Sequence, residues 1–222
     1  MDRSGRDSEG IPAATVARLP HYLRALRDMQ VGGAATTLSA ELADVSGVSS
    51  AQLRKDLSFL GTFGKRGVGY DVAALSAAIS QVLGLEAVHR LAIIGVGNLG
   101  HALANYSGYA KRGFTVVALL DSAASVVGTR TDSGLLIEHV SHLERVFARE
   151  AVTMVVLALP SPAGQEIAER VVAAGVREIL SFAPVSLQLP DDVVVRSVDV
   201  AGELQILAFH AAARTSNEAV ED

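Results

Sequence analysis

Three closely spaced glycines give the clearest chemical signal in the chain. Gly95, Gly97 and Gly100 form a G-x-G-x-x-G pattern between an apolar run and a helix-forming stretch. In that context the first glycine permits a tight turn, the second lets the backbone approach a pyrophosphate, and the third lets the helix pack closely on the strand. The N–H groups at the start of the helix would face the phosphates. The pattern therefore predicts a dinucleotide-binding turn made of Gly95, Val96, Gly97, Asn98, Leu99 and Gly100.

An acidic residue follows the motif at the distance that a dinucleotide site requires. Asp121 comes directly after the apolar run 114–120, about 20 residues beyond the glycines. A carboxylate there accepts hydrogen bonds from both hydroxyls of an adenosine ribose and repels a 2′-phosphate, and residues 122–125 contain no arginine to hold one. NAD(H) is therefore favoured over NADP(H). A turn that binds no ligand, with Asp121 as a helix cap, is the alternative.

A second candidate site lies near the N-terminus. Residues 39–43 and 49–57 predict two short helices, joined by the Gly-containing turn 46–48. This is the arrangement of a helix-turn-helix. Ser49 and Gln52 form a capping-box pattern at the start of the second helix.

The second of these helices predicts a surface for DNA. Its polar side chains, Asp56 among them, surround the apolar pair Leu53 and Leu57. Such side chains reach base edges or phosphates from a major groove. The candidate contacts on this helix are Ser50, Gln52, Arg54 and Lys55. The Gly-rich segment 61–70 then fits a wing, with Lys65 and Arg66 near the phosphate backbone. A helical bundle with a solvated charged face is the alternative.

The pattern of elements changes once along the chain. Residues 12–84 consist of helical patterns and turns, whereas residues 90–213 alternate short β-branched runs with helical stretches. Such alternation is typical of βαβ units in a parallel sheet. Lys111, Arg112 and Gly113 would end the helix that follows the glycine motif. The expected strands are 91–96, 114–120, 153–160, 178–182 and 193–198.

Two smaller groups of residues give weaker indications of a binding site. Pro160 ends an expected strand and so lies at the carboxyl edge of the sheet, where ligands bind. His139 and His142 lie three apart on a predicted helix, but no carboxylate–His pattern accompanies them. They indicate a solvated face, and no metal site is expected.

Composition limits the class of protein. The chain has 222 residues, of which 50% are hydrophobic and 19% charged, so it folds into one large domain or two small ones. It has no cysteine, which excludes disulfides and thiolate catalysis. Without an apolar run of ~18 residues or a signal peptide, a cytoplasmic protein away from the membrane is expected. The net charge of −5 hides a basic module, because residues 11–70 carry seven basic and four acidic residues.

From about residue 11 to residue 213 the chain resembles the Rex family of redox-sensing transcriptional repressors. The matching stretches are IPAATVARLPHYLR at 11–24, SAELADVSGVSSAQLRKDLSFLGTFGKRGVGYDV at 39–72, GVGNLG at 95–100, ANYSGYAKRGF at 104–114, FAPV at 182–185 and VDVAGELQ at 198–205. The resemblance implies an α/β protein: an N-terminal winged helix-turn-helix domain, a C-terminal Rossmann-like doubly wound parallel sheet, and a last helix swapped between the subunits of a homodimer.

The resemblance also implies a function. Rex proteins sense the NADH/NAD⁺ ratio, and NADH favours a compact dimer that cannot place both recognition helices on a palindromic operator. It implies that Tyr106 and Asp199 lie near the nicotinamide and the subunit contact, and that Pro184 lies on a loop beside the nicotinamide. From the residues alone, Tyr106 is equally a half-buried helix residue and Asp199 the N-cap of the last helix.

The expected organisation is a tail (1–10), a winged-helix DNA-binding domain (11–86), a Rossmann NAD(H)-binding domain (87–198), a dimerisation helix (199–214) and a second tail (215–222). Little chain is left for the substrate domain of an NAD-dependent dehydrogenase, and no Tyr-x-x-x-Lys pair includes Tyr106. We therefore expect a sensor that is not an enzyme, with such a dehydrogenase as the alternative.

Overall fold

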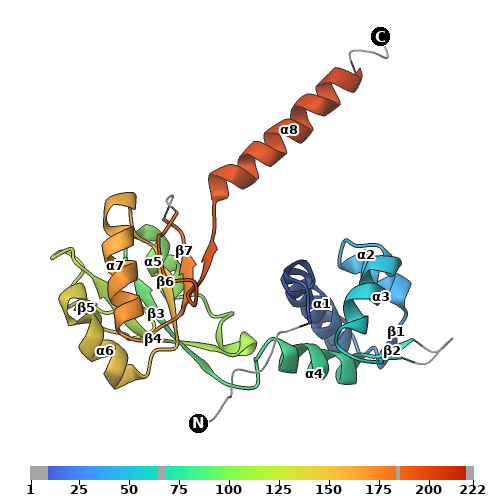
Figure 1. The fold of residues 1–222 in the computed structure, drawn as a ribbon, viewed down its shortest axis with the longest axis horizontal. Coiled ribbons are helices and arrows are strands. Elements are labelled where there is room, and N and C mark those ends of the chain that lie inside the picture. The colour runs from blue at the N-terminus through green and yellow to red at the C-terminus, as the bar shows by residue number, and fades with distance from the viewer. Residues whose placement is uncertain (1–9, 65–68, 184–185, 219–222) are drawn as a thin grey trace. The chain divides into compact units, whose positions relative to one another are not determined.

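The computed structural model describes residues 10–64, 69–183 and 186–218, and the chain divides into two compact units. The first unit ends at Ala87 and the second begins at Val88. Figure 1 shows the helical first unit and the second unit, which is built around a sheet. Each unit has its own hydrophobic core.

In residues 10–64 and 69–87, the described part of the N-terminal unit, four helices and a small sheet are formed. The helices are α1 (Ala13–Val31), α2 (Ser39–Val45), α3 (Ser50–Ser58) and α4 (Val72–Val82). Strand β1 (Thr36–Thr37) pairs antiparallel with β2 (Tyr70–Asp71). All four helices direct leucines inward, because apolar residues recur at helical spacing along each of them. The fully buried leucines are Leu19, Leu26, Leu42, Leu53 and Leu75.

Local capping fixes where two of these helices begin. The Ser49 side chain accepts a hydrogen bond of 3.1 Å from the backbone N–H of Gln52, which confirms the predicted N-cap of α3. The reciprocal half of the capping box does not form, because the Gln52 amide bonds to Asp56 instead. Asp71 caps α4 by accepting a hydrogen bond of 2.8 Å from the N–H of Ala74.

Six parallel strands form the sheet of the second unit in the order β5-β4-β3-β6-β7-β8. Their bounds are β3 His89–Ile94, β4 Phe114–Asp121, β5 Ile137–His139, β6 Met154–Leu157, β7 Glu178–Ser181 and β8 Val194–Ser197. The strand order reverses between β3 and β6, which is the topology of the Rossmann fold, whose ligands bind at that switch point.

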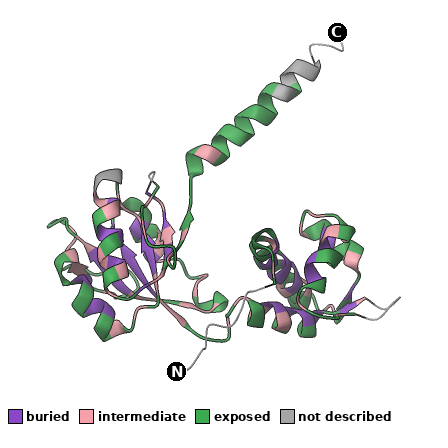
Figure 2. Cartoon of the chain, viewed as in Figure 1, coloured by how far each residue is buried: buried purple, intermediate pink, exposed green. Residues whose placement is uncertain are grey.

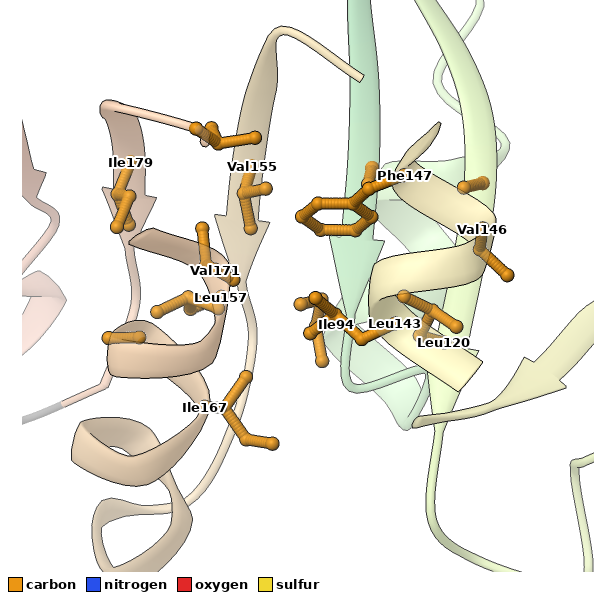
Figure 3. Packing of buried hydrophobic residues seen from close by; sticks show 14 residues of the cluster. Ile94, Leu120, Leu143, Val146, Phe147, Val155, Leu157, Ile167, Val171 and Ile179 are labelled. Atoms are coloured by element: carbon orange, nitrogen blue, oxygen red, sulfur yellow. The ribbon is translucent and has the colours of Figure 1, made fainter. Parts of the chain in front are cut away.

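Helices cover both faces of this sheet. Helices α6 (Leu143–Glu150) and α7 (Ser161–Ala173) pack on one face, where Phe147 and Val171 meet the strand residues Ile94 and Leu157 (Figure 3). Helix α5 (Asn98–Ala104) belongs to the other face, where Ala104 joins a cluster of buried strand side chains. Because the strands of this sheet all run parallel, their carboxyl ends form one edge.

Three sequence expectations for this unit are wrong. Strand β5 was not expected, since it has only three residues. The helix after the glycine motif ends at Ala104, because Asn105 and Gly108 are poor helix formers, and the cations Lys111 and Arg112 lie on a separate 3-10 turn, η1 (Ala110–Arg112). The histidine pair does not lie on an α-helix: His139 ends β5, and His142 ends the 3-10 turn η2 (Val140–His142). Among the residues described, no group of three potential metal ligands occurs.

The last helix, α8 (Val200–Glu218), has little contact with its own unit. Its described side chains are exposed, and most of the helix is green in Figure 2. Leu204, Leu207 and Phe209 are 60%, 62% and 70% exposed. Asp199 caps its start by accepting a hydrogen bond of 3.0 Å from the N–H of Gly202. Across the described part of the chain, no helix has the length and hydropathy of a membrane span.

Candidate functional site

The glycine motif forms the tight turn that its spacing predicts. Gly95 has a φ of +91°, and a Cβ there would lie 2.5 Å from the carbonyl oxygen of Ala158. At Gly100 a Cβ would overlap the carbonyl oxygen of Gly95, so the close packing of helix and strand requires glycine. Around Gly97 no atom lies within 4 Å of the Cβ position. The first and third glycines therefore serve the fold, whereas the second leaves backbone open to a ligand.

Asp121 holds this turn against the end of β4. Its Oδ2 accepts a hydrogen bond of 2.6 Å from the N–H of Val96, and its Oδ1 accepts one of 2.8 Å from the N–H of Ala123. No helix follows in residues 122–127, so the helix-cap alternative is wrong. Each carboxylate oxygen can accept further hydrogen bonds, which leaves Asp121 able to bind ribose hydroxyls.

Three other candidate residues, Leu99, Pro160 and Asp199, lie at the edge formed by the carboxyl ends of the strands. A cavity of about 490 Å³ lies there, and the predicted residues Leu99 and Asp199 both line it. Pro160 lies between β6 and α7 at the same edge, outside this lining. The remaining lining residues are Phe182, Ala183, Ser186, Ser197, Val198, Val200 and Ala201. None of these was predicted as a site residue, although the position of Phe182 after β7 and of Val198 after β8 was a usable signal.

Tyr106 is not among the described residues that line this cavity. Tyr106 follows α5, is half exposed, and packs edge-on against Tyr109 with 5.1 Å between ring centroids. Pro184 lies outside the described residues. The N-cap reading of Asp199 is confirmed by its bond to Gly202, and that bond occupies only one of its carboxylate oxygens.

The helix-turn-helix of the first unit is formed by α2, the turn 46–48 and α3. Arg54 and Lys55 are exposed on α3, and Ser50 and Gln52 are half-buried near its start. The guanidinium of Arg54 donates a hydrogen bond of 3.3 Å to the Ser39 hydroxyl at the start of α2. Lys65 and Arg66, the predicted wing contacts, lie outside the described residues.

Asp56 is the residue of α3 that sequence reasoning misplaced. We expected a polar surface residue, but its side chain is buried and accepts hydrogen bonds from four residues of α1 and α3. The bonds from Arg18 hold the pKa of Asp56 well below its usual range. Burial, together with the negative Asp56, raises the pKa of Tyr22 to about 12. The carboxylate is therefore ionised inside the unit.

Fold and site together define a class of protein. A helix-turn-helix unit followed by a doubly wound unit with a G-x-G-x-x-G turn is typical of a DNA-binding regulator with a nucleotide-binding domain. The comparisons with known proteins agree with this class. A family model described as "Putative DNA-binding protein N-terminus" matches residues 10–58, and one described as "CoA binding domain" matches residues 87–185.

The chain belongs to the Rex family of redox-sensing transcriptional repressors. It is 49% identical to the Rex repressor of Streptomyces coelicolor, over 99% of this chain and 85% of that protein. It is 42% identical to the Rex repressor of Syntrophomonas wolfei, over 91% and 96% of the two chains. The solved structure of RSP, a Rex-family repressor, matches with a TM-score of 0.86 and 30% identity, over 96% of this chain and 99% of the other.

Proposed function

We propose that this chain represses transcription as a homodimer on a palindromic operator and leaves the DNA when it binds NADH. The observation that carries the proposal is the open backbone at Gly97 beside a carboxylate at Asp121, in a chain that also contains a helix-turn-helix. RSP, a Rex-family repressor, has been solved with β-NADH and with β-NAD⁺ and operator DNA, which supports the proposal that this chain binds the nucleotide and DNA.

In the nucleotide site, three parts of NAD(H) each have a matching place: the pyrophosphate, the adenosine ribose and the nicotinamide. The pyrophosphate lies over the turn at Gly97, where no side chain intervenes. The adenosine ribose hydroxyls bond to Asp121, whose charge opposes a phosphate on that ribose. Because coenzyme A carries such a phosphate, Asp121 favours NAD(H) over coenzyme A at this site. The nicotinamide then extends toward the cavity that Phe182 and Asp199 line.

In the DNA site, α3 is the recognition helix. Arg54 and Lys55 are exposed cations on it, and Ser50 and Gln52 lie in its first turn, the part of such helices that contacts base edges. Lys65 and Arg66 contribute phosphate contacts from the wing. A palindromic operator mirrors the two-fold symmetry of a dimer, and the exposed apolar residues of α8 supply a surface for the second subunit.

Repression and release follow from thermodynamic linkage between the two sites. NADH releases the repressor only if its affinity for one form of the dimer, the form that does not bind DNA, exceeds its affinity for the DNA-binding form. Operator DNA must then weaken NADH binding by the same factor, on the order of 5- to 150-fold for typical couplings. In this proposal the nucleotide is a sensed ligand and is not turned over, and the protein acts in the cytoplasm where its DNA lies.

One titration tests the proposal. The full-length protein is first used to select a palindromic duplex from a randomised library. The labelled duplex is then bound to the protein at fixed salt, and the complex is titrated with NADH or with NAD⁺. We expect release by NADH at concentrations where NAD⁺ has little effect. DNA affinity that does not respond to NADH would refute the sensor. Sustained oxidation of NADH with carbonyl compounds would instead favour a dehydrogenase.

A further inference from the structure

A buried carboxylate joins the recognition helix to helix α1. Asp56 of α3 has no exposed surface, and each of its oxygens accepts hydrogen bonds from α1. Thr15 donates to Oδ1 at 2.9 Å, Tyr22 donates to Oδ2 at 2.7 Å, and the Arg18 guanidinium donates to both oxygens at 2.7 Å. These bonds come from three residues, so the position of the carboxylate is fixed on the side that faces α1.

The same carboxylate fixes the side-chain amide of Gln52. Gln52 Nε2 donates a hydrogen bond of 2.9 Å to Asp56 Oδ1, one helical turn further along α3. An ionised carboxylate only accepts hydrogen bonds, so the amide must present its N–H to Asp56 and not its oxygen. The usual ambiguity of a glutamine amide is thereby removed, because the reversed orientation would place two acceptors face to face.

The remaining edge of the Gln52 amide is available to a ligand. Among the residues that the structure describes, Asp56 alone pairs with this side chain, so Oε1 and the second N–H are left over. Gln52 is half-buried and lies in the first turn of α3, the part of a recognition helix that approaches base edges. An acceptor beside a donor matches adenine, which offers N6–H and N7 in the major groove. Guanine offers two acceptors there and would oppose Oε1.

We propose that Gln52 reads an adenine in each half of the operator, and that Asp56 is the positioning residue that aims its amide. This inference rests on the proposed function, since it requires that α3 enters a major groove. It assigns Gln52 to base recognition rather than to phosphate binding. It also gives Thr15, Arg18 and Tyr22, the three partners of Asp56 on α1, a role in specificity through the carboxylate that they hold.

The test replaces adenines of the selected duplex, one at a time, by 7-deazaadenine, which lacks the N7 acceptor. We expect one position in each half-site at which this change weakens binding of the full-length protein by about tenfold. In Gln52→Met, which keeps a side chain of similar length without the amide, the penalty at that position should disappear. The matched control Gln81→Ala removes an exposed glutamine of α4 and should keep the wild-type pattern.

A second measurement tests the positioning role of Asp56 without altering it. In free protein labelled with ¹⁵N, the Gln52 side-chain amide is assigned by its absence in Gln52→Met, and its hydrogen exchange is compared with that of Gln81. We expect slower exchange at Gln52, because one N–H is bound to Asp56. Equal exchange rates at Gln52 and Gln81 would overturn the role of Asp56.

The adenine scan has its own contradicting outcomes. If no adenine replacement weakened binding, or if the penalty stayed the same in Gln52→Met, the proposed contact of Gln52 with adenine would be wrong, whereas the proposed repressor function would stand. If the wild-type protein bound no duplex at all, the proposed function itself would be contradicted.

Discussion

Asp121 and Val96 are joined by a hydrogen bond of 2.6 Å between the carboxylate of the first and the backbone N–H of the second, 25 residues apart in the chain. The bond ties the end of β4 to the glycine turn after β3, so the carboxylate proposed to bind the ribose and the turn proposed to bind the pyrophosphate are held together without a ligand. Such preorganisation lowers the conformational cost of binding. Asp121 is therefore part of the turn itself, in addition to its proposed role toward the ribose.

Asp121→Ala should weaken NADH binding by roughly 10- to 100-fold, because hydrogen bonds to a charged group are lost together with the anchor of the turn. Discrimination against NADPH should fall as well, since the charge that repels a 2′-phosphate is removed. Fluorescence titration with both nucleotides measures this. Asp191→Ala, at an exposed aspartate of the same unit, is the control and should bind as the wild type does. Unchanged NADH affinity in Asp121→Ala would show that the ribose lies elsewhere.

Gly97→Ala and Gly100→Ala should separate binding from folding. Gly97 has a φ of −70°, which alanine adopts readily, and its Cβ position is open, so the variant should melt like the wild type and lose NADH affinity. In Gly100→Ala the new methyl group would overlap the Gly95 carbonyl, which should cost about 1–3 kcal/mol of stability. Thermal unfolding and NADH titration of both variants check this. A Gly97→Ala variant that binds NADH normally would contradict the placement of the pyrophosphate.

Asp56 should make the stability of the first unit depend on acid. Its pKa is lower in the folded protein than in the unfolded chain, so its stabilisation is complete above the unfolded value of about 4 and is lost as the pH falls through the folded value. Asp56→Asn should lose about 2–3 kcal/mol at neutral pH, because Arg18 loses its charged partner. The variant should then show less additional loss below pH 4. Denaturant unfolding from pH 7 to pH 2 measures both effects, and parallel pH profiles for the two proteins would refute the assignment.

Leu207→Glu should weaken dimerisation, because it places a charge on the exposed apolar surface of α8. The expected result is a shift toward monomer in light scattering after size exclusion, with weaker binding to a palindromic duplex. Gln205→Glu adds the same charge to an exposed polar position of this helix and is the matched control. Equal dimer stability in both variants would show that α8 does not form the subunit contact.

Sequence patterns alone were sufficient for the parts of this protein that depend on local backbone rules. The spacing of Gly95, Gly97 and Gly100 defines a turn because the limits on φ and on Cβ contacts act within a few residues. Periodic apolar residues likewise predicted the helix-turn-helix and the parallel sheet, and Ser49 marked the start of α3 correctly.

Tertiary structure decided whatever depends on segments that are distant in the chain. Asp56 looked like a surface charge, since its partners Thr15, Arg18 and Tyr22 lie 34 to 41 residues away on α1. Phe182 and Asp199 line one cavity only because parallel strands bring their carboxyl ends to one edge. A hydrogen bond or a cavity wall depends on distances of a few ångströms, and residue spacing along the chain does not set those distances between separate elements. The sequence therefore determined which chemistry is present, and the packing of α1 on α3 and of strand beside strand decided which side chains carry it out together.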